Sequence, residues 1–185
     1  PVVTSFTPLQ GVRGTTITVT GSGFRHPITG ASIVTGVSVG GVAATSFNVV
    51  SNTSLTLVVP VGAVDGRVAV TTAGGTSSSA ASFDVWTPPV ITAVAPSPAR
   101  PGTVVTVTGV DFIGTATAAT GVPTVTLNGT NIPTRTVNAN GTSMTLTLPA
   151  AASNGELRIT ARGGVGVSTL LVVQAAPTIT SFSPT

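Results

Sequence analysis

Apolar and polar residues alternate along short stretches of this chain, and Gly or Pro interrupts each stretch. In Thr15–Gly21, Ile17 and Val19 fall on one side of an extended backbone, and the intervening threonines fall on the other. A period of two residues is the pattern of a β-strand that buries one face. Seven such stretches precede residue 88, and none has the 3.6-residue period of a helix. The pattern predicts an all-β chain built as immunoglobulin-like sandwiches.

One phrase of eight residues occurs three times. It begins at Pro1 (Pro-Val-Val-Thr-Ser-Phe-Thr-Pro), Pro89 (Pro-Val-Ile-Thr-Ala-Val-Ala-Pro) and Pro177 (Pro-Thr-Ile-Thr-Ser-Phe-Ser-Pro), with a spacing of 88 residues. Inward positions of the strands repeat with the phrase, whereas outward positions do not. Two copies of one core with different surfaces would give this result. We therefore expect one domain over residues 1–88 and a second over 89–176, with 177–185 as the first strand of a third repeat.

The repeated motifs resemble the IPT/TIG domain. They are Pro-x-Ile/Val-Thr-x-Phe/Val-x-Pro, then Gly-Thr-x-Val/Ile-Thr-Val-Thr-Gly-x-x-Phe, then Gly-Gly-Val-Ala-Ala, then a strand that ends in Val-Pro or Leu-Pro. The resemblance covers both units and the final phrase, and it implies an early-set immunoglobulin-type sandwich. Such domains occur in bacterial surface proteins, in polysaccharide-processing enzymes as accessory domains, and in animal receptors and transcription factors. The receptor versions usually carry cysteines and the DNA-binding versions basic loops, so this chain is most similar to the bacterial surface type.

Composition narrows the possible partners. Charged residues make up 6% of the chain and the net charge is only +3. The seven arginines are scattered apart from Arg158 and Arg162, whereas nucleic-acid binding needs a clustered basic face. No apolar run approaches the roughly 20 residues of a membrane-spanning helix. We expect no nucleic-acid partner and no membrane insertion, but a surface poorly protected against association with copies of itself.

Catalytic chemistry has little to build on. The chain has no Cys, His26 is its only histidine, and no spacing ties His26 to Asp65, Asp84 or Asp111. Two carboxylates per repeat are too few for a calcium site made of side chains. The Gly-rich turns precede no helix, so they do not form a phosphate loop. We expect no enzyme activity, no metal and no cofactor.

Two loops are weak candidates for ligand binding, at residues 25–36 and 113–123. Only Phe24, Arg25, His26 and Phe112 lie in or beside them and have the side chains that binding loops favour. A glycan or a host surface would be the ligand in this interpretation.

The junction between the repeats contains Trp86, Pro88 and Pro89. Proline fixes φ and removes a hydrogen-bond donor, so the junction is expected to be short and stiff. Trp86 is expected to pack at the junction, although its ring could also stack on a sugar.

The final phrase suggests how the chain assembles. Ile179 and Phe182, between Pro177 and Pro184, repeat Val3 and Phe6 of the first strand. Either this strand belongs to a third unit of the same chain, or it adds to the sheet of a neighbouring copy. Both versions predict an extracellular bacterial filament or stalk assembled head to tail. The alternative is an immunoglobulin-like binding or spacer module of an adhesin or a carbohydrate-active protein.

Overall fold

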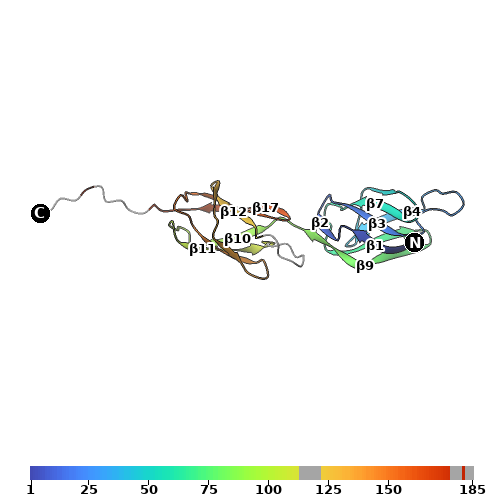
Figure 1. Ribbon diagram of the computed structural model, residues 1–185, viewed down its shortest axis with the longest axis horizontal. Helices are drawn as coiled ribbons and strands as arrows, with labels where there is room; N and C mark the ends of the chain where they lie inside the picture. Colours follow the sequence, from blue (N-terminus) through green and yellow to red (C-terminus); the bar gives the residue numbers. More distant parts are fainter. Residues whose placement is uncertain (113–121, 176–180, 182–185) are drawn as a thin grey trace. The chain divides into compact units, whose positions relative to one another are not determined.

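The computed structural model describes residues 1–112, 122–175 and 181 (Figure 1). Contacts within the chain divide it into two units, Pro1–Trp86 and Thr87–Thr185. The described residues contain strands and turns but no helix, which confirms the all-β prediction. The strand predicted within 177–185 lies outside the described residues, apart from Ser181.

Unit 1 is a sandwich of two sheets. One sheet has the order β1-β3-β7-β6 and the other β2-β9-β8-β4-β5, and only β2 and β9 pair in parallel. The first segment of the chain is therefore shared between the sheets, since β1 pairs with β3 and β2 with β9. The strands are β1 (Val2–Thr7), β2 (Gln10–Val12), β3 (Thr16–Ser22), β4 (Val34–Val39), β5 (Val42–Ala43), β6 (Phe47–Val49), β7 (Ser54–Val58), β8 (Gly66–Thr72) and β9 (Gly75–Trp86).

Unit 2 has the same plan. Its sheets have the orders β10-β11-β15-β14 and β13-β12-β16-β17. A single parallel bridge between Ala99 and Val173 stands where unit 1 has the β2–β9 pair. The strands are β10 (Val90–Ala95), β11 (Val104–Val110), β12 (Thr124–Leu127), β13 (Thr130–Asn131), β14 (Arg135–Val137), β15 (Ser143–Thr147), β16 (Gly155–Ala161) and β17 (Gly164–Leu171).

The core of each unit comes from the inward residues of the alternating strands. Ile17 and Val19 of β3 are completely buried, as are Val105 and Val107 of β11. Removing this apolar surface from water is the main favourable contribution to folding. The other large buried side chains include Leu55, Leu57, Val68, Val70 and Phe83 in unit 1, and Leu127, Met144, Leu146, Leu157 and Ile159 in unit 2.

Two details differ from the sequence predictions. The loop expected over residues 25–36 is shorter, because β4 begins at Val34. Ala81, expected to face inward, is exposed, and Ser79 is buried instead. The pairing of β8 with β9 shifts register at this point. The Ser79 hydroxyl accepts a hydrogen bond from the Val68 N–H at 3.0 Å and donates to the Ala81 carbonyl at 2.6 Å. These bonds satisfy the polar groups of the bulge, and Ser168 does the same beside Leu157 in unit 2.

A glycine near the end of β3 makes room for an aromatic ring. A Cβ added at Gly21 would collide with the Val2 carbonyl and with the ring of Phe24, and Gly109 has the same relation to Val90 and Phe112. The glycine therefore lets the first strand approach while the ring fills the end of the core.

We expect Gly21→Ala to destabilise the protein by about 1–3 kcal/mol, because the added methyl group meets backbone that cannot yield without shifting β1. Gly36→Ala is the matched control in β4, since it has open space around it and should change stability by less than about 0.5 kcal/mol. Urea unfolding of both variants measures the difference. Equal unfolding midpoints would contradict this account.

Candidate functional site

The loop that follows Phe24, residues 25–33, is held in place by Arg25; we call it the tip loop. The Arg25 guanidinium donates to the carbonyl of Gly30 at 3.2 Å, and to those of Val49 and Val50 at 2.8 and 3.0 Å. It thus ties the loop to the end of β6. Arg25 therefore has an internal structural role, and its charge is directed at backbone oxygens of its own unit.

His26 fixes the turn at the tip of this loop. Its Nδ1 accepts hydrogen bonds from the backbone N–H groups of Ile28 and Thr29, both at 3.3 Å. The His26 N–H donates to the carbonyl of Ala31 at 2.8 Å, and the Gly30 N–H donates to the carbonyl of His26 at 2.9 Å. Ile28 remains 88% exposed at the tip. Figure 1 shows the tip loop projecting from unit 1 beside the N-terminus.

The two phenylalanines predicted beside the ligand loops are core residues. Phe24 and Phe112 have no exposed surface, so neither ring is available to a ligand. Residues 113–121 of the second candidate loop lie outside the described residues. Phe6 and Phe83 are also buried, while Phe47 and Trp86 are half-buried. Within residues 1–112 and 122–175, no aromatic ring is fully exposed as a platform for stacking on a sugar.

Val3 and Phe6, the counterparts of the predicted assembly residues, lie in the core of unit 1, with 8% and 5% exposure. Their strand β1 pairs with β3, and the Val3 N–H donates to the Ser77 hydroxyl of β9 at 3.0 Å. The place of the first strand is therefore filled by the chain itself. Pro177, Ile179, Phe182 and Pro184 lie outside the described residues.

The predicted junction residues belong to both units. Trp86 is the last residue of β9 and is in register with Val12 of β2 in unit 1. Thr87 belongs to unit 2, where its hydroxyl donates to the Asp111 carboxylate at 2.5 Å. Asp111 has a φ of 60°, which is uncommon for a residue other than glycine, and Gly23 occupies the corresponding place in unit 1. The sequence analysis did not identify this contact.

The turn between β16 and β17 supports the same segment of unit 2. A Cβ added at Gly163 would collide with the Thr87 carbonyl, and one at Gly166 would collide with the carbonyl of Pro89. Pro88 is exposed, whereas Pro89 is buried. Unit 1 has Ser77 at the position equivalent to Gly166, so the additional glycine accompanies the entry of the chain into unit 2.

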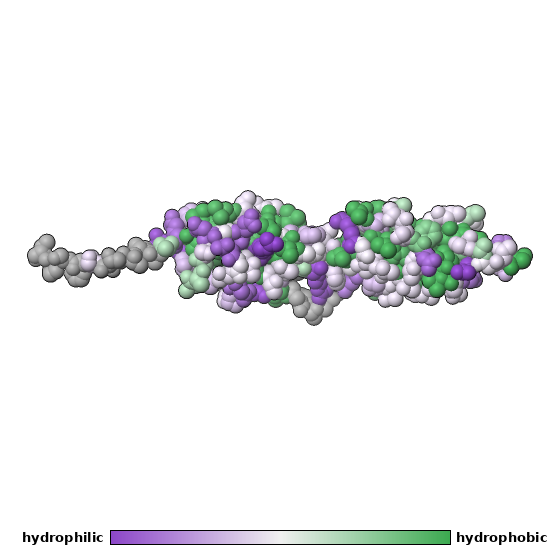
Figure 2. Space-filling model, turned by 90° about the horizontal axis from the view of Figure 1, so that it is seen from above, coloured by the Kyte–Doolittle hydropathy of each residue, from purple (hydrophilic) through white to green (hydrophobic). Residues whose placement is uncertain are grey.

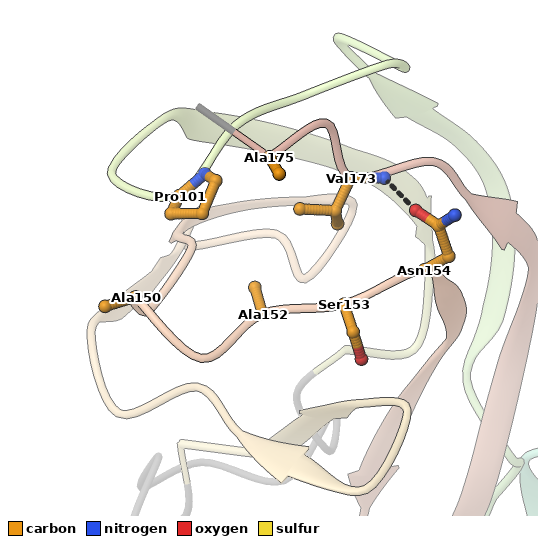
Figure 3. A pocket seen from close by; sticks show the side chains of 7 residues that line it. All are labelled: Pro101, Ala150, Ala152, Ser153, Asn154, Val173 and Ala175. Atoms are coloured by element: carbon orange, nitrogen blue, oxygen red, sulfur yellow. Dashed lines mark hydrogen bonds between the residues drawn. The ribbon is translucent and has the colours of Figure 1, made fainter. Parts of the chain in front are cut away.

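A shallow cavity of about 680 Å³ lies where the chain leaves β17 (Figure 3). Its apolar lining comes from Pro101, Ala150, Ala152, Val173 and Ala175. Ser153 and Asn154 complete the lining, and the Asn154 side-chain oxygen accepts a hydrogen bond from the Val173 N–H at 2.6 Å. We call this cavity the exit pocket.

The exit pocket depends on one residue that differs between the units. Arg13 of unit 1 and Pro101 of unit 2 hold the same position in a turn, each followed by a glycine with positive φ. The Arg13 guanidinium donates to the carbonyl of Ala63 at 3.2 and 3.4 Å and so spans this part of unit 1. Pro101 has no group that could reach Ala152, the counterpart of Ala63.

The described residues offer no site for a metal ion, since no group of three or more His, Asp or Glu side chains comes together among them. In the same part of the chain, no helix is long and apolar enough to cross a membrane. The surface is instead weakly polar, with exposed apolar side chains on each unit (Figure 2).

Comparison with protein families decides the relationship of the chain. The model of the IPT/TIG domain matches residues 1–85 and again 89–173. The chain belongs to the IPT/TIG family. Both IPT/TIG repeats have the sandwich architecture that the sequence resemblance implied.

Solved structures with a similar fold include surface proteins of bacteria and animals. SGBP-B from a complex xyloglucan utilization locus in Bacteroides uniformis is 20% identical over 91% of this chain and 48% of its own, with a TM-score of 0.42. The surface glycan-binding protein PbSGBP-B from Prevotella bryantii is 18% identical over 86% of this chain and 36% of its own (TM-score 0.42). The plexin A4 extracellular region is 16% identical over 95% of this chain and 18% of its own (TM-score 0.43). This chain thus spans less than half the length of each of these structures. Curated proteins gave no match.

We expect Arg25→Ala to loosen the tip loop, because three carbonyl groups lose a charged donor. Hydrogen bonds to charged groups contribute about 1.5–3 kcal/mol, so exchange of the His26 and Gly30 amide hydrogens should accelerate by about tenfold. Arg67→Ala, at an exposed arginine of β8, is the control. Unchanged protection in Arg25→Ala would show that the loop is held by other contacts.

Proposed function

We propose that this IPT/TIG pair is a structural, non-catalytic module of an extracellular bacterial fibre, stalk or surface protein, in which immunoglobulin-like units follow one another head to tail. The junction supports this proposal most directly. Trp86 is fixed in the β2–β9 pair of unit 1, and the next residue, Thr87, is bound by Asp111 in unit 2. No free residue separates the two attachments, and such a junction restricts bending between consecutive units.

The chemistry of the described surface fits a structural role better than a binding role. Specific sugar sites commonly present an exposed aromatic face, and the described rings are buried or half-buried. The two charged or titratable side chains of the tip loop, Arg25 and His26, are engaged with the backbone. An extracellular location is part of this proposal, as is self-association.

The proposal includes the final phrase, residues 177–185, as the first strand of a further unit of the fibre. Strand addition to a neighbouring copy would have to displace β1 or β10. β1 already buries Val3 and Phe6, and both strands pair with their own sheets. Pairing within the same chain needs no such displacement.

The test is whether the two units tumble as one body. We expect ¹⁵N relaxation to give the same rotational correlation time for unit 1 and unit 2 in the parent protein. In Asp111→Gly the Thr87 hydroxyl loses its acceptor, and glycine suits the positive φ, so the units should tumble more independently without unfolding. Gly163→Ala should act in the same direction by displacing the Thr87 carbonyl.

Glu156→Gln, at another carboxylate of unit 2, is the control and should leave tumbling unchanged. Independent tumbling of the units in the parent protein would contradict the proposed stiff module. A glycan array on the same protein tests the alternative, because specific binding would favour a carbohydrate-binding function.

A further inference from the structure

Contact between copies of this chain requires surfaces that are free in the folded protein. The first-strand positions are occupied by β1 in unit 1 and β10 in unit 2. Two other features remain available, namely the tip loop with its exposed Ile28 and the exit pocket of unit 2.

The tip loop is suited to insertion into an apolar recess. Its end, Pro27-Ile28-Thr29, presents an isoleucine side chain that is 88% exposed. The Arg25 and His26 hydrogen bonds fix the backbone on both sides of this end. A preorganised loop loses little conformational entropy on binding, so more of the apolar contact energy appears as affinity.

The exit pocket is suited to receive such an end. Five of its seven lining residues are apolar, and the volume of about 680 Å³ exceeds that of one side chain. Unit 1 has no equivalent opening at this position, because Arg13 bridges to Ala63. In the described part of the chain, the recess therefore arises only where Pro101 replaces the arginine.

The two features lie at opposite ends of the chain path. The tip loop adjoins the place where the chain enters unit 1, since the position of a Cβ on Gly23 is 3.3 Å from Pro1. The exit pocket includes Ala175, where the chain leaves unit 2. A knob and a recess on different parts of one molecule form a heterologous contact, which repeats without closing unless the rotation happens to form a ring.

We propose that Ile28 at the tip loop of one copy inserts into the exit pocket of a second copy, and that this contact joins copies head to tail. This inference rests on the proposed structural role of the module and names the surfaces through which it associates. A weak apolar contact of this kind, repeated along a fibre, would gain strength from multivalency.

Two single substitutions test the contact from its two sides. Ile28→Asp places a charge on the inserting end, and Pro101→Arg introduces the residue that unit 1 has in the same turn. The arginine fits this turn, because Val12–Thr15 and Arg100–Thr103 have the same backbone hydrogen bond. Val61→Asp is the matched control, since Val61 is 91% exposed and lies outside both surfaces.

Sedimentation velocity is measured on the 185-residue chain up to about 1 mM, the range in which contacts of about −4 kcal/mol become populated. We expect concentration-dependent association of the parent protein and of Val61→Asp, and its loss in each of the other two variants. An equimolar mixture of Ile28→Asp and Pro101→Arg should form a dimer that grows no further, because each variant retains one intact surface.

A parent protein that stays monomeric at this concentration would overturn the inference, as would association that survives both substitutions. Association that is lost only on removal of residues 177–185 would replace it with strand addition. These outcomes are independent of the stiffness of the junction, which is measured on the monomer and tests the proposed function separately.

Discussion

The structure depends on pairing its strands in the one register that turns Val, Ile and Leu toward the space between two sheets. In β3, Ile17 and Val19 are buried while their neighbours Thr16 and Thr20 are exposed. A slip of one residue would exchange these faces and bring threonine hydroxyl groups into the core. With only 6% charged residues, the chain has few ion pairs with which to offset such a loss. Apolar burial and backbone hydrogen bonds therefore position everything else, including the turns at the two ends of each unit.

Those turns give the repeats different properties although their cores are alike. The turn with Arg13 in unit 1 has Pro101 in unit 2, and an arginine bridge is replaced by a recess. The glycine at position 23 in unit 1 is replaced by Asp111, which binds the hydroxyl of Thr87. Both substitutions preserve the backbone conformation and change only what the end of the unit can bind. Repeats that share a fold can thus be specialised as links in an ordered series.

The sequence predicted the part of this structure that follows from periodicity. Alternation identified the inward residues of β3, β7, β11 and β15, and the repeat period placed equivalent strands in the two units. Alternation failed at Ser79, because a bulge changes the period and a hydroxyl group satisfies the buried Val68 N–H. The sequence also could not show that Phe24 fills the core beside an open tip loop, since an aromatic residue after a glycine turn is compatible with either place. The exit pocket and the Thr87–Asp111 contact arise from residues distant in sequence, although Pro101, Asp111 and Gly166 do stand out when the two repeats are compared position by position.

The central claim is that this IPT/TIG pair serves as a stiff structural unit in a series of such units. Electron microscopy of the native material, unstained and at modest protein concentration, tests it most directly. The account predicts filaments or stalks with an axial repeat that corresponds to one or two immunoglobulin-like domains. Dispersed particles that show no end-to-end order would contradict it.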